Sequence, residues 1–194
     1  MPLGANKVAL YGASADTGSA VLLSTATASS DASIEFTLPT AYKQVVFSWY
    51  SILPATDDDD FKMNVSSDGG STWVTKTSSF FAANHTEADD NAVLQYEGSD
   101  DLAQSTSDQT ISRNVGSASD EGCAGTMQLY SPSSTTYVKH WTSRSSGYGG
   151  GGSPRAWDNF GGGYANTTSS LNKIRFLFSS GNISSGTIKM WGVS

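Results

Sequence analysis

The chain has 194 residues, with 11 Lys and Arg against 18 Asp and Glu, so its formal net charge is −7. This acidity argues against nucleic acid or an anionic membrane surface as a partner, because both carry negative charge themselves. The single cysteine, Cys123, excludes an internal disulfide and any zinc site built from several cysteines.

Small and hydroxylated side chains dominate the composition, with 33 Ser, 19 Thr and 20 Gly residues. They interrupt every window in which apolar residues recur three and four apart, so no amphipathic helix is expected. Aromatic residues make up 11% of the chain, and we expect a core of Phe, Tyr and Trp. The longest apolar runs are about four residues, too short to cross a membrane. The first residues also lack the sustained apolar stretch of a secretory signal.

In chain order, residues 1–30 come first and are poor in large apolar groups, which predicts an extended N-terminal arm with room for a short strand at Val21–Ser24. Beyond it, alternation of apolar and polar residues recurs, as is typical of half-buried strands. Strands are expected at Ile34–Leu38, Val45–Ile52, Phe61–Val65, Thr126–Tyr130, Tyr137–Thr142, Ile174–Phe178 and Thr187–Val193. Many short strands between Ser-, Gly- and Asn-rich turns predict an all-β fold, a single antiparallel, jelly-roll-like β-sandwich over residues 31–194.

The segment Ser145–Gly163 holds eight glycines and predicts a long loop held in place by its aromatic residues. A Tyr or Trp on a β-surface can stack on a sugar ring, and both are also common at subunit interfaces. The candidates for a glycan or partner contact are Tyr148, Trp157, Phe160 and Tyr164. The third interpretation is that they only cap the end of the sandwich.

The segment SSDGGSTW resembles the Asp-box of sialidases, written S-x-D-x-G-x-T-W, at Ser66, Asp68, Gly70, Thr72 and Trp73. In sialidases this box is a structural turn away from the catalytic site, so the resemblance implies a turn and no reaction. Asp68 can accept hydrogen bonds from backbone amides of the turn, and a glycine supplies the positive φ. We therefore expect a hairpin covered by the indole of Trp73.

An acidic loop follows the second expected strand and contains Asp57, Asp58, Asp59 and Asp60. Ca²⁺ binds six to eight oxygens, which makes these residues weak candidate ligands. The loop lacks the alternating D-x-D-x-D-G pattern, and consecutive aspartates point in different directions. The alternative is a solvated loop whose charges oppose edge-to-edge association of sheets. No other metal and no cofactor is expected.

Catalytic constellations are sparse. The two histidines, His85 and His140, lack a metal-ligand spacing such as H-x-x-x-H. Cys123 is expected to be a small buried residue and not a nucleophile. Paired carboxylates for glycoside hydrolysis depend on spatial separation, which a sequence does not give. We expect a non-enzymatic protein, with a glycan-depolymerising enzyme as the remote alternative.

Six stretches distributed along the chain carry a likeness to known proteins: Pro2–Ala9, the SSDGGSTW segment, Phe81–His85, Asp101–Ser107, Ser131–His140 and Phe178–Val193. Together they resemble a group of virion-associated proteins common in marine bacteriophages, especially phages of cyanobacteria. The likeness covers essentially the whole chain and is specific for the group more than for a function.

This resemblance implies a non-enzymatic structural protein exposed on a virus particle and made in the host cytoplasm. Its partners would be other virion proteins, of capsid or tail, and copies of itself, in a closed oligomer such as a trimer. Two roles compete, capsid decoration and a tail fibre or adhesin, and the arm is where we expect attachment. The alternative is a carbohydrate-binding module for host surface glycans, which can coexist with an adhesin role.

Overall fold

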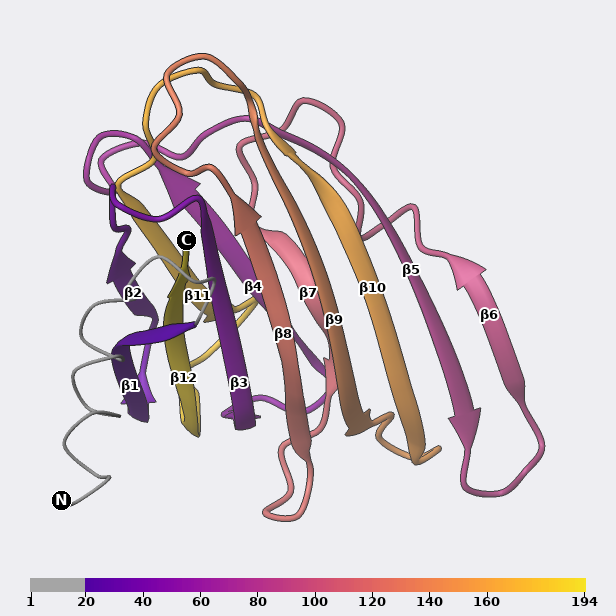
Figure 1. The fold of residues 1–194 in the computed structure, drawn as a ribbon. Helices are drawn as coiled ribbons and strands as arrows, with labels where there is room; N and C mark the ends of the chain where they lie inside the picture. Colours follow the sequence, from indigo (N-terminus) through magenta and orange to yellow (C-terminus); the bar gives the residue numbers. More distant parts are fainter. Residues whose placement is uncertain (1–19) are drawn as a thin grey trace, which may run out of the picture.

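The structure is a computed structural model and describes residues 20–194. In this part of the chain all regular secondary structure is β-strand (Figure 1). The strands are β1 (Val21–Asp31), β2 (Ile34–Thr37), β3 (Gln44–Pro54), β4 (Asp59–Ser66), β5 (Lys76–Thr86), β6 (Ala92–Tyr96), β7 (Gln109–Val115), β8 (Gly122–Tyr130), β9 (Lys139–Gly149), β10 (Arg155–Ala165), β11 (Lys173–Phe178) and β12 (Ile183–Val193). Among these residues no helix is long and apolar enough to span a membrane.

Two antiparallel sheets pack together, which confirms the expected β-sandwich. The large sheet has the order β1-β12-β3-β8-β9-β10-β5-β6 and the small sheet the order β2-β11-β4-β7. Within them lies the strand order of an eight-stranded jelly roll, β2-β11-β4-β7 facing β3-β8-β5-β6. The β9–β10 hairpin is inserted between β8 and β5, and β12 and β1 extend the large sheet beyond β3. The large sheet is therefore much wider than the small one.

The sandwich begins earlier in the chain than the sequence predicts. Residues 21–30, assigned to the arm, belong to β1, which pairs with β12 from Val21 to Asp31. β1 is rich in Ser, Thr and Ala and forms one edge of the large sheet. Residues 1–19 of the expected arm lie outside the described residues.

An aromatic cluster joins the two sheets. Phe176 of β11 lies with its ring centroid 5.2 Å from that of Phe47 on β3 and 6.0 Å from that of Phe61 on β4. Phe36, Trp49 and Phe178 also belong to the cluster, and all six side chains are buried. The core is thus built from Phe and Trp as expected, but no tyrosine of residues 20–194 is buried in it.

The expected glycine-rich loop is wrong, because most of Ser145–Gly163 forms the ends of β9 and β10 around a short turn. Glycine is needed where another backbone passes too close for a side chain. A Cβ on Gly149 would lie 2.1 Å from the carbonyl oxygen of Asn114, and one on Gly163 would lie 2.4 Å from that of Thr77. These glycines therefore indicate close packing of strands and not a mobile loop.

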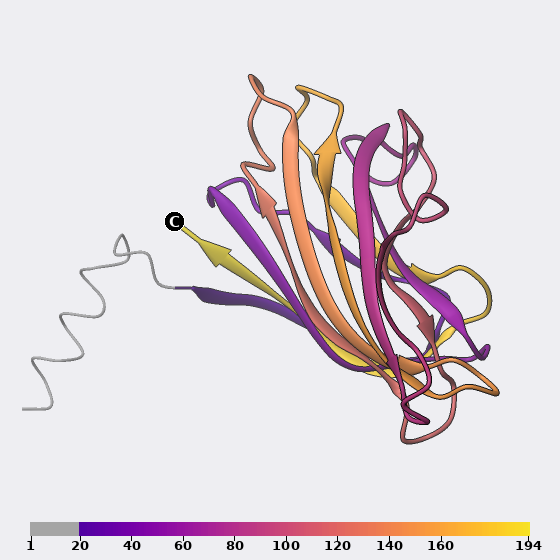
Figure 2. The same cartoon turned by 90° about the vertical axis from the view of Figure 1, so that its right-hand side faces the viewer.

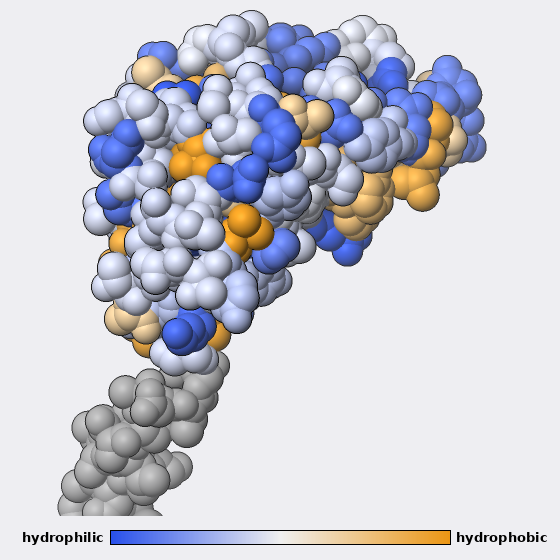
Figure 3. Space-filling model, turned by 90° about the horizontal axis from the view of Figure 1, so that it is seen from above, coloured by the Kyte–Doolittle hydropathy of each residue, from blue (hydrophilic) through white to orange (hydrophobic). Residues whose placement is uncertain are grey.

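The large sheet has an inner face that covers the small sheet and an outer face exposed to solvent. Its strands twist strongly, so that β1 and β12 splay away from β10 and β5 in the side view (Figure 2). Seen from above, hydrophobic residues gather at the end of the molecule where Figure 1 places β5 and β6 (Figure 3). Leu94 of β6 is 69% exposed and Tyr96 is 58% exposed.

Candidate functional site

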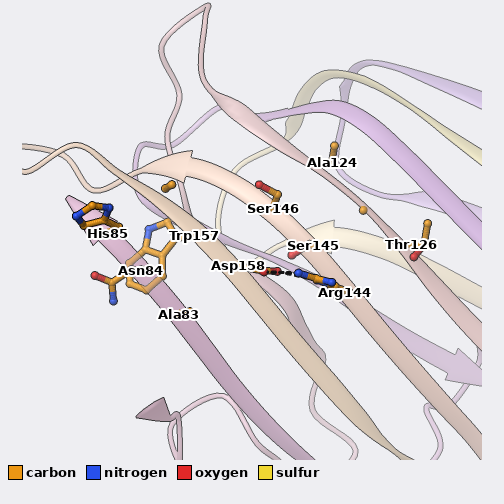
Figure 4. A pocket seen from close by; sticks show the side chains of 12 residues that line it. Ala83, Asn84, His85, Ala124, Thr126, Arg144, Ser145, Ser146, Trp157 and Asp158 are labelled. Carbon is orange, nitrogen blue, oxygen red and sulfur yellow. Dashed lines mark hydrogen bonds and ion pairs between the residues drawn. The ribbon is translucent and has the colours of Figure 1, made fainter. Parts of the chain in front are cut away.

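A groove of about 740 Å³ crosses the outer face of the large sheet over four neighbouring strands (Figure 4). A second hollow of about 720 Å³ shares His85, Ala124, Ser146 and Ala156 with it and extends it toward one end of the strands. The outward-pointing side chains of the groove are Ala83 and His85 on β5, Ala156 and Asp158 on β10, Arg144 and Ser146 on β9, and Ala124 and Thr126 on β8.

The strand register explains why the sheet is hollow here. Ala83 pairs with Asp158, Asp158 with Ser146, and Ser146 with Ala124. In the next row His85 pairs with Ala156. Side chains that pair across a sheet stand side by side, so small residues in the same row on adjacent strands leave a trough across the strands.

One wall of the groove is an ordered ion pair. Arg144 Nε donates to Asp158 Oδ1 at 3.0 Å and Nη2 donates to Oδ2 at 2.7 Å. These hydrogen bonds, and the charge of Asp158, raise the pKa of Arg144 above its ordinary value. The guanidinium also lies over the ring of Phe160, 4.8 Å from its centroid, and Phe160 stacks on Phe81 at 4.9 Å. Stacking on one side and the carboxylate on the other fix the position of the Arg144 side chain.

The opposite end of the groove is acidic. His85 Nε2 lies 2.9 Å from Asp89 Oδ1. Burial first, and then the charges of Glu87, Glu121 and Asp120, raise the pKa of Tyr148 above its ordinary value. The groove therefore runs from a rigid Arg–Asp pair to a tyrosine hydroxyl among carboxylates. The floor between these two ends is mostly alanine.

The four aromatic residues expected to form one contact surface are not brought together. Trp157 is only 5% exposed, points to the inner face and lies beneath Arg113. Phe160 has one ring face against Phe81 and the other against Arg144, so neither is free for a sugar. Of the remaining two, Tyr148 lines the acidic end of the groove, and Tyr164 lies toward the other end of β10, near His140.

The Asp-box segment is a structural turn held by its own side chains. Asp68 accepts hydrogen bonds from the backbone N–H of Thr72 at 2.9 Å and from its hydroxyl at 2.6 Å. The Ser66 hydroxyl donates to Asp68 at 2.7 Å and accepts from the N–H of Gly70 at 2.9 Å. Gly69 and Gly70 have φ of 79° and 94°.

This turn differs from the expected hairpin because it connects two sheets. β4 belongs to the small sheet and β5 to the large sheet, and one backbone bond, from Val74 N to Val65 O, closes the turn locally. Trp73 covers the guanidinium of Arg175, whose carbon lies 3.9 Å from the ring centroid. None of residues 66–73 lines the groove.

The four aspartates of the acidic loop bind three segments of the chain. Asp60 accepts from Asn114 N and Asp57 from Ser117 N, at the end of β7, while Asp58 accepts from Gly150 N and Asp59 from Ser180 N. Their carboxylates therefore hold neighbouring loops together and do not share one centre. Within residues 20–194 no three His, Cys, Asp or Glu side chains converge as metal ligands would.

Cys123 is buried on the inner face of β8, and burial raises its pKa to about 12. A thiol with this pKa stays protonated and is a poor nucleophile.

No family model matches the chain, and neither a curated protein nor a solved structure is detectably similar to it. No similar protein therefore indicates what the groove binds. The sequence does not predict Arg144, Asp158 or the alanines of the groove as site residues. They are far apart in the chain and become neighbours only because of the way β5, β10, β9 and β8 pair. The one local signal for the groove is the alternation along β9, and the glycines at the end of this strand obscure it because they suggest a loop.

Proposed function

We propose that the protein is a non-enzymatic adhesin-type component of a bacteriophage particle, and that the groove binds a glycan of the host surface. The observation that carries the glycan part is the groove itself, with fixed hydrogen-bonding groups on both walls and an apolar floor. Pockets for small ligands combine an apolar lining with a few placed polar groups in this way.

The chemistry of a sugar ring matches these features. Its hydroxyls donate to carboxylates and accept from a guanidinium, which Asp158 and Arg144 supply side by side. Its C–H face needs a flat apolar surface, which Ala83, Ala156 and Ala124 supply between the walls. A groove that crosses four strands suits a linear chain of several sugars.

Binding fits these groups better than catalysis does. Glycoside hydrolysis uses two carboxylates, one of them a proton donor. Asp158 is the one carboxylate lining the hollow beside Arg144, and both its oxygens are engaged by the guanidinium.

The particle location rests on two separate supports. One is the resemblance of the chain to virion-associated phage proteins. The other is the jelly-roll strand order, which is common in viral capsid proteins and in lectins. An adhesin role unites them, since it requires both exposure on a particle and recognition of a surface glycan.

The test is binding of the full chain to an array of bacterial lipopolysaccharides and capsular polysaccharides. We expect saturable binding to a subset of them, lost in Ala156→Trp, which fills the groove. Thr142→Trp is the matched control, because Thr142 is exposed on the same face of β9 outside the groove. No binding by the wild type, or equal binding by Ala156→Trp, would refute the glycan proposal. Immunogold labelling of purified particles tests the location independently: labelled tails support an adhesin, and unlabelled particles contradict it.

A further inference from the structure

β6 forms the second edge of the large sheet, and backbone N–H and C=O groups on its outer side have no partner strand among residues 20–194. The Glu97 N–H donates to Phe80 O, and the Thr86 N–H donates to Asn91 O, so residues 91 and 97 face β5. Backbone groups alternate along a strand, so the N–H and C=O of Ala92, Leu94 and Tyr96 point away from β5. The sheet order ends at β6, and no further strand of residues 20–194 pairs there.

This edge is also apolar on its outer face. Leu94 and Tyr96 are among the most exposed large hydrophobic residues of the described chain, and Phe81 beside them is 40% exposed. Natural sheets usually protect an edge with charged residues or proline on the strand itself. β6, with the sequence AVLQY, carries neither.

The surroundings of the edge are strongly acidic. Residues 77–112, which include β6 and all of β5 after Lys76, contain seven Asp or Glu and neither Lys nor Arg. Two of these acids, Glu97 and Asp100, pair with Arg113, and the other five lack that partner. Asp89 and Asp90 precede β6, and Asp101 follows it. Two β6 edges pairing with each other would bring these acids together, which disfavours a symmetric pair. The partner strand should be apolar and flanked by positive charge.

We infer that the edge of β6 accepts residues 7–12 of a neighbouring copy of this chain as an added strand. This segment, KVALYG, has apolar residues after Lys7, and the first acid of the chain is Asp16. In an extended conformation Val8 and Leu10 fall on one face and can cover Leu94 and Tyr96. Lys7 then meets the acids at an end of β6.

The length of the intervening chain favours a neighbour over the same molecule. β1 and β6 are the two edges of the large sheet, seven strand spacings apart, which is about 34 Å. The connection from Gly12, where the added strand ends, to Val21 at the start of β1 spans at most about 32 Å when fully extended. Reaching its own β6 would leave this connection no slack. A head-to-tail exchange of segments has no such limit and builds rings or chains of copies.

The test is sedimentation velocity of the full chain with two variants. Leu94→Pro removes an outward N–H and leaves the bonds to β5, as proline allows on an edge strand. Val8→Asp/Leu10→Asp gives the arm an acidic segment that the acidic edge repels. We expect the wild type to assemble as its concentration rises, with each variant at least about tenfold weaker in association. An equimolar mixture should form one-to-one dimers, because one variant keeps the edge and the other keeps the arm.

Each other outcome has a defined meaning. A wild type that stays monomeric at all concentrations overturns the inference. So does a mixture that stays monomeric, or an arm variant that assembles like the wild type, which would indicate edge-to-edge pairing. Leu94→Lys repeats the edge test without a backbone change, and thermal unfolding confirms that the variants are folded. The result is independent of glycan binding, since the groove residues are unchanged.

Discussion

Arg144 and Asp158 form a two-pronged ion pair between β9 and β10 on the outer face of the large sheet, with N–O distances of 3.0 and 2.7 Å. Arg144 is 66% exposed, so the pair contributes little to stability. Its position at the wall of the groove gives it a larger part in recognition.

We expect Arg144→Ala to leave the free energy of unfolding nearly unchanged and to weaken glycan binding at least about tenfold. The matched control is Lys173→Ala, which breaks the exposed pair with Glu35 (2.7 Å) outside the groove. Chemical denaturation and polysaccharide binding of both variants give the comparison. Equal glycan binding by the two variants would remove Arg144 from the site.

At Gly149 the end of β9 passes close to the backbone at the end of β7. A Cβ there would lie 2.1 Å from the Asn114 oxygen and 2.6 Å from the Gly116 nitrogen, both backbone atoms that cannot rotate away. We expect Gly149→Ala to cost more than about 2 kcal/mol by overpacking. Gly152→Ala, where a Cβ has no atom within 4 Å, should change stability by less than about 0.5 kcal/mol. Urea unfolding of the two variants decides whether the glycines of this hairpin are there for packing.

The regular strands of the sandwich could be predicted from residue alternation. Val45, Phe47 and Trp49 alternate with smaller or more polar residues, and their side chains point from β3 into the core of the sandwich, as that pattern predicts. β10 could not be predicted in this way. Glycine occurs in this strand because neighbouring strands approach its backbone closely. That approach depends on the tertiary structure, so a local sequence pattern does not show it.

β7 was missed for a related reason. Its inward residues include Gln109 and Ser112, which are buried with partners from distant segments. The groove has the same origin, since Ala83, Ala124 and Asp158 share no local pattern. The Asp-box turn, in contrast, is local, and its hydrogen bonds could be predicted from the SSDGGSTW segment alone.

Phe176 is the central member of the aromatic cluster between the sheets, with four aromatic neighbours on β2, β3 and β4. We expect Phe176→Ala to destabilise the protein by about 3–5 kcal/mol, because it removes transfer free energy and leaves a cavity. Phe81→Ala, on the exposed outer face, removes the same atoms and should cost less than about 1.5 kcal/mol. Similar losses in the two variants would contradict the assignment of the core.

Lys76 is a buried ammonium bonded to Asn64 Oδ1 at 2.5 Å and to the carbonyl of Val74 at 2.8 Å. Burial lowers its pKa from 10.5 to about 8. Between pH 8 and 10.5 the unfolded chain therefore holds a proton that the folded protein has released, so this group makes stability rise with pH.

We expect the stability difference between the wild type and Lys76→Met to shift in favour of the wild type by about 2–3 kcal/mol from pH 7 to pH 10.5. Denaturant unfolding of both proteins across this range measures the shift. The comparison cancels the other groups that titrate at high pH, because both proteins contain them. A difference that stays constant with pH would show that Lys76 keeps its ordinary pKa.

Asp68 gives a dependence of the same sign at acidic pH, where stability again rises with pH. Hydrogen bonds from the side chain and backbone of Thr72, followed by that from Ser66, lower its pKa from 3.8 to about 2. The folded protein thus holds this carboxylate ionised where the unfolded chain has begun to protonate it. The stabilisation is complete above pH 4 and is lost as the pH falls toward 2. We expect Asp68→Asn to be less stable than the wild type at pH 6 and to lose less of its stability between pH 4 and pH 2. Thermal unfolding in that window measures both slopes, and parallel slopes would mean that the turn does not depend on the charge of Asp68.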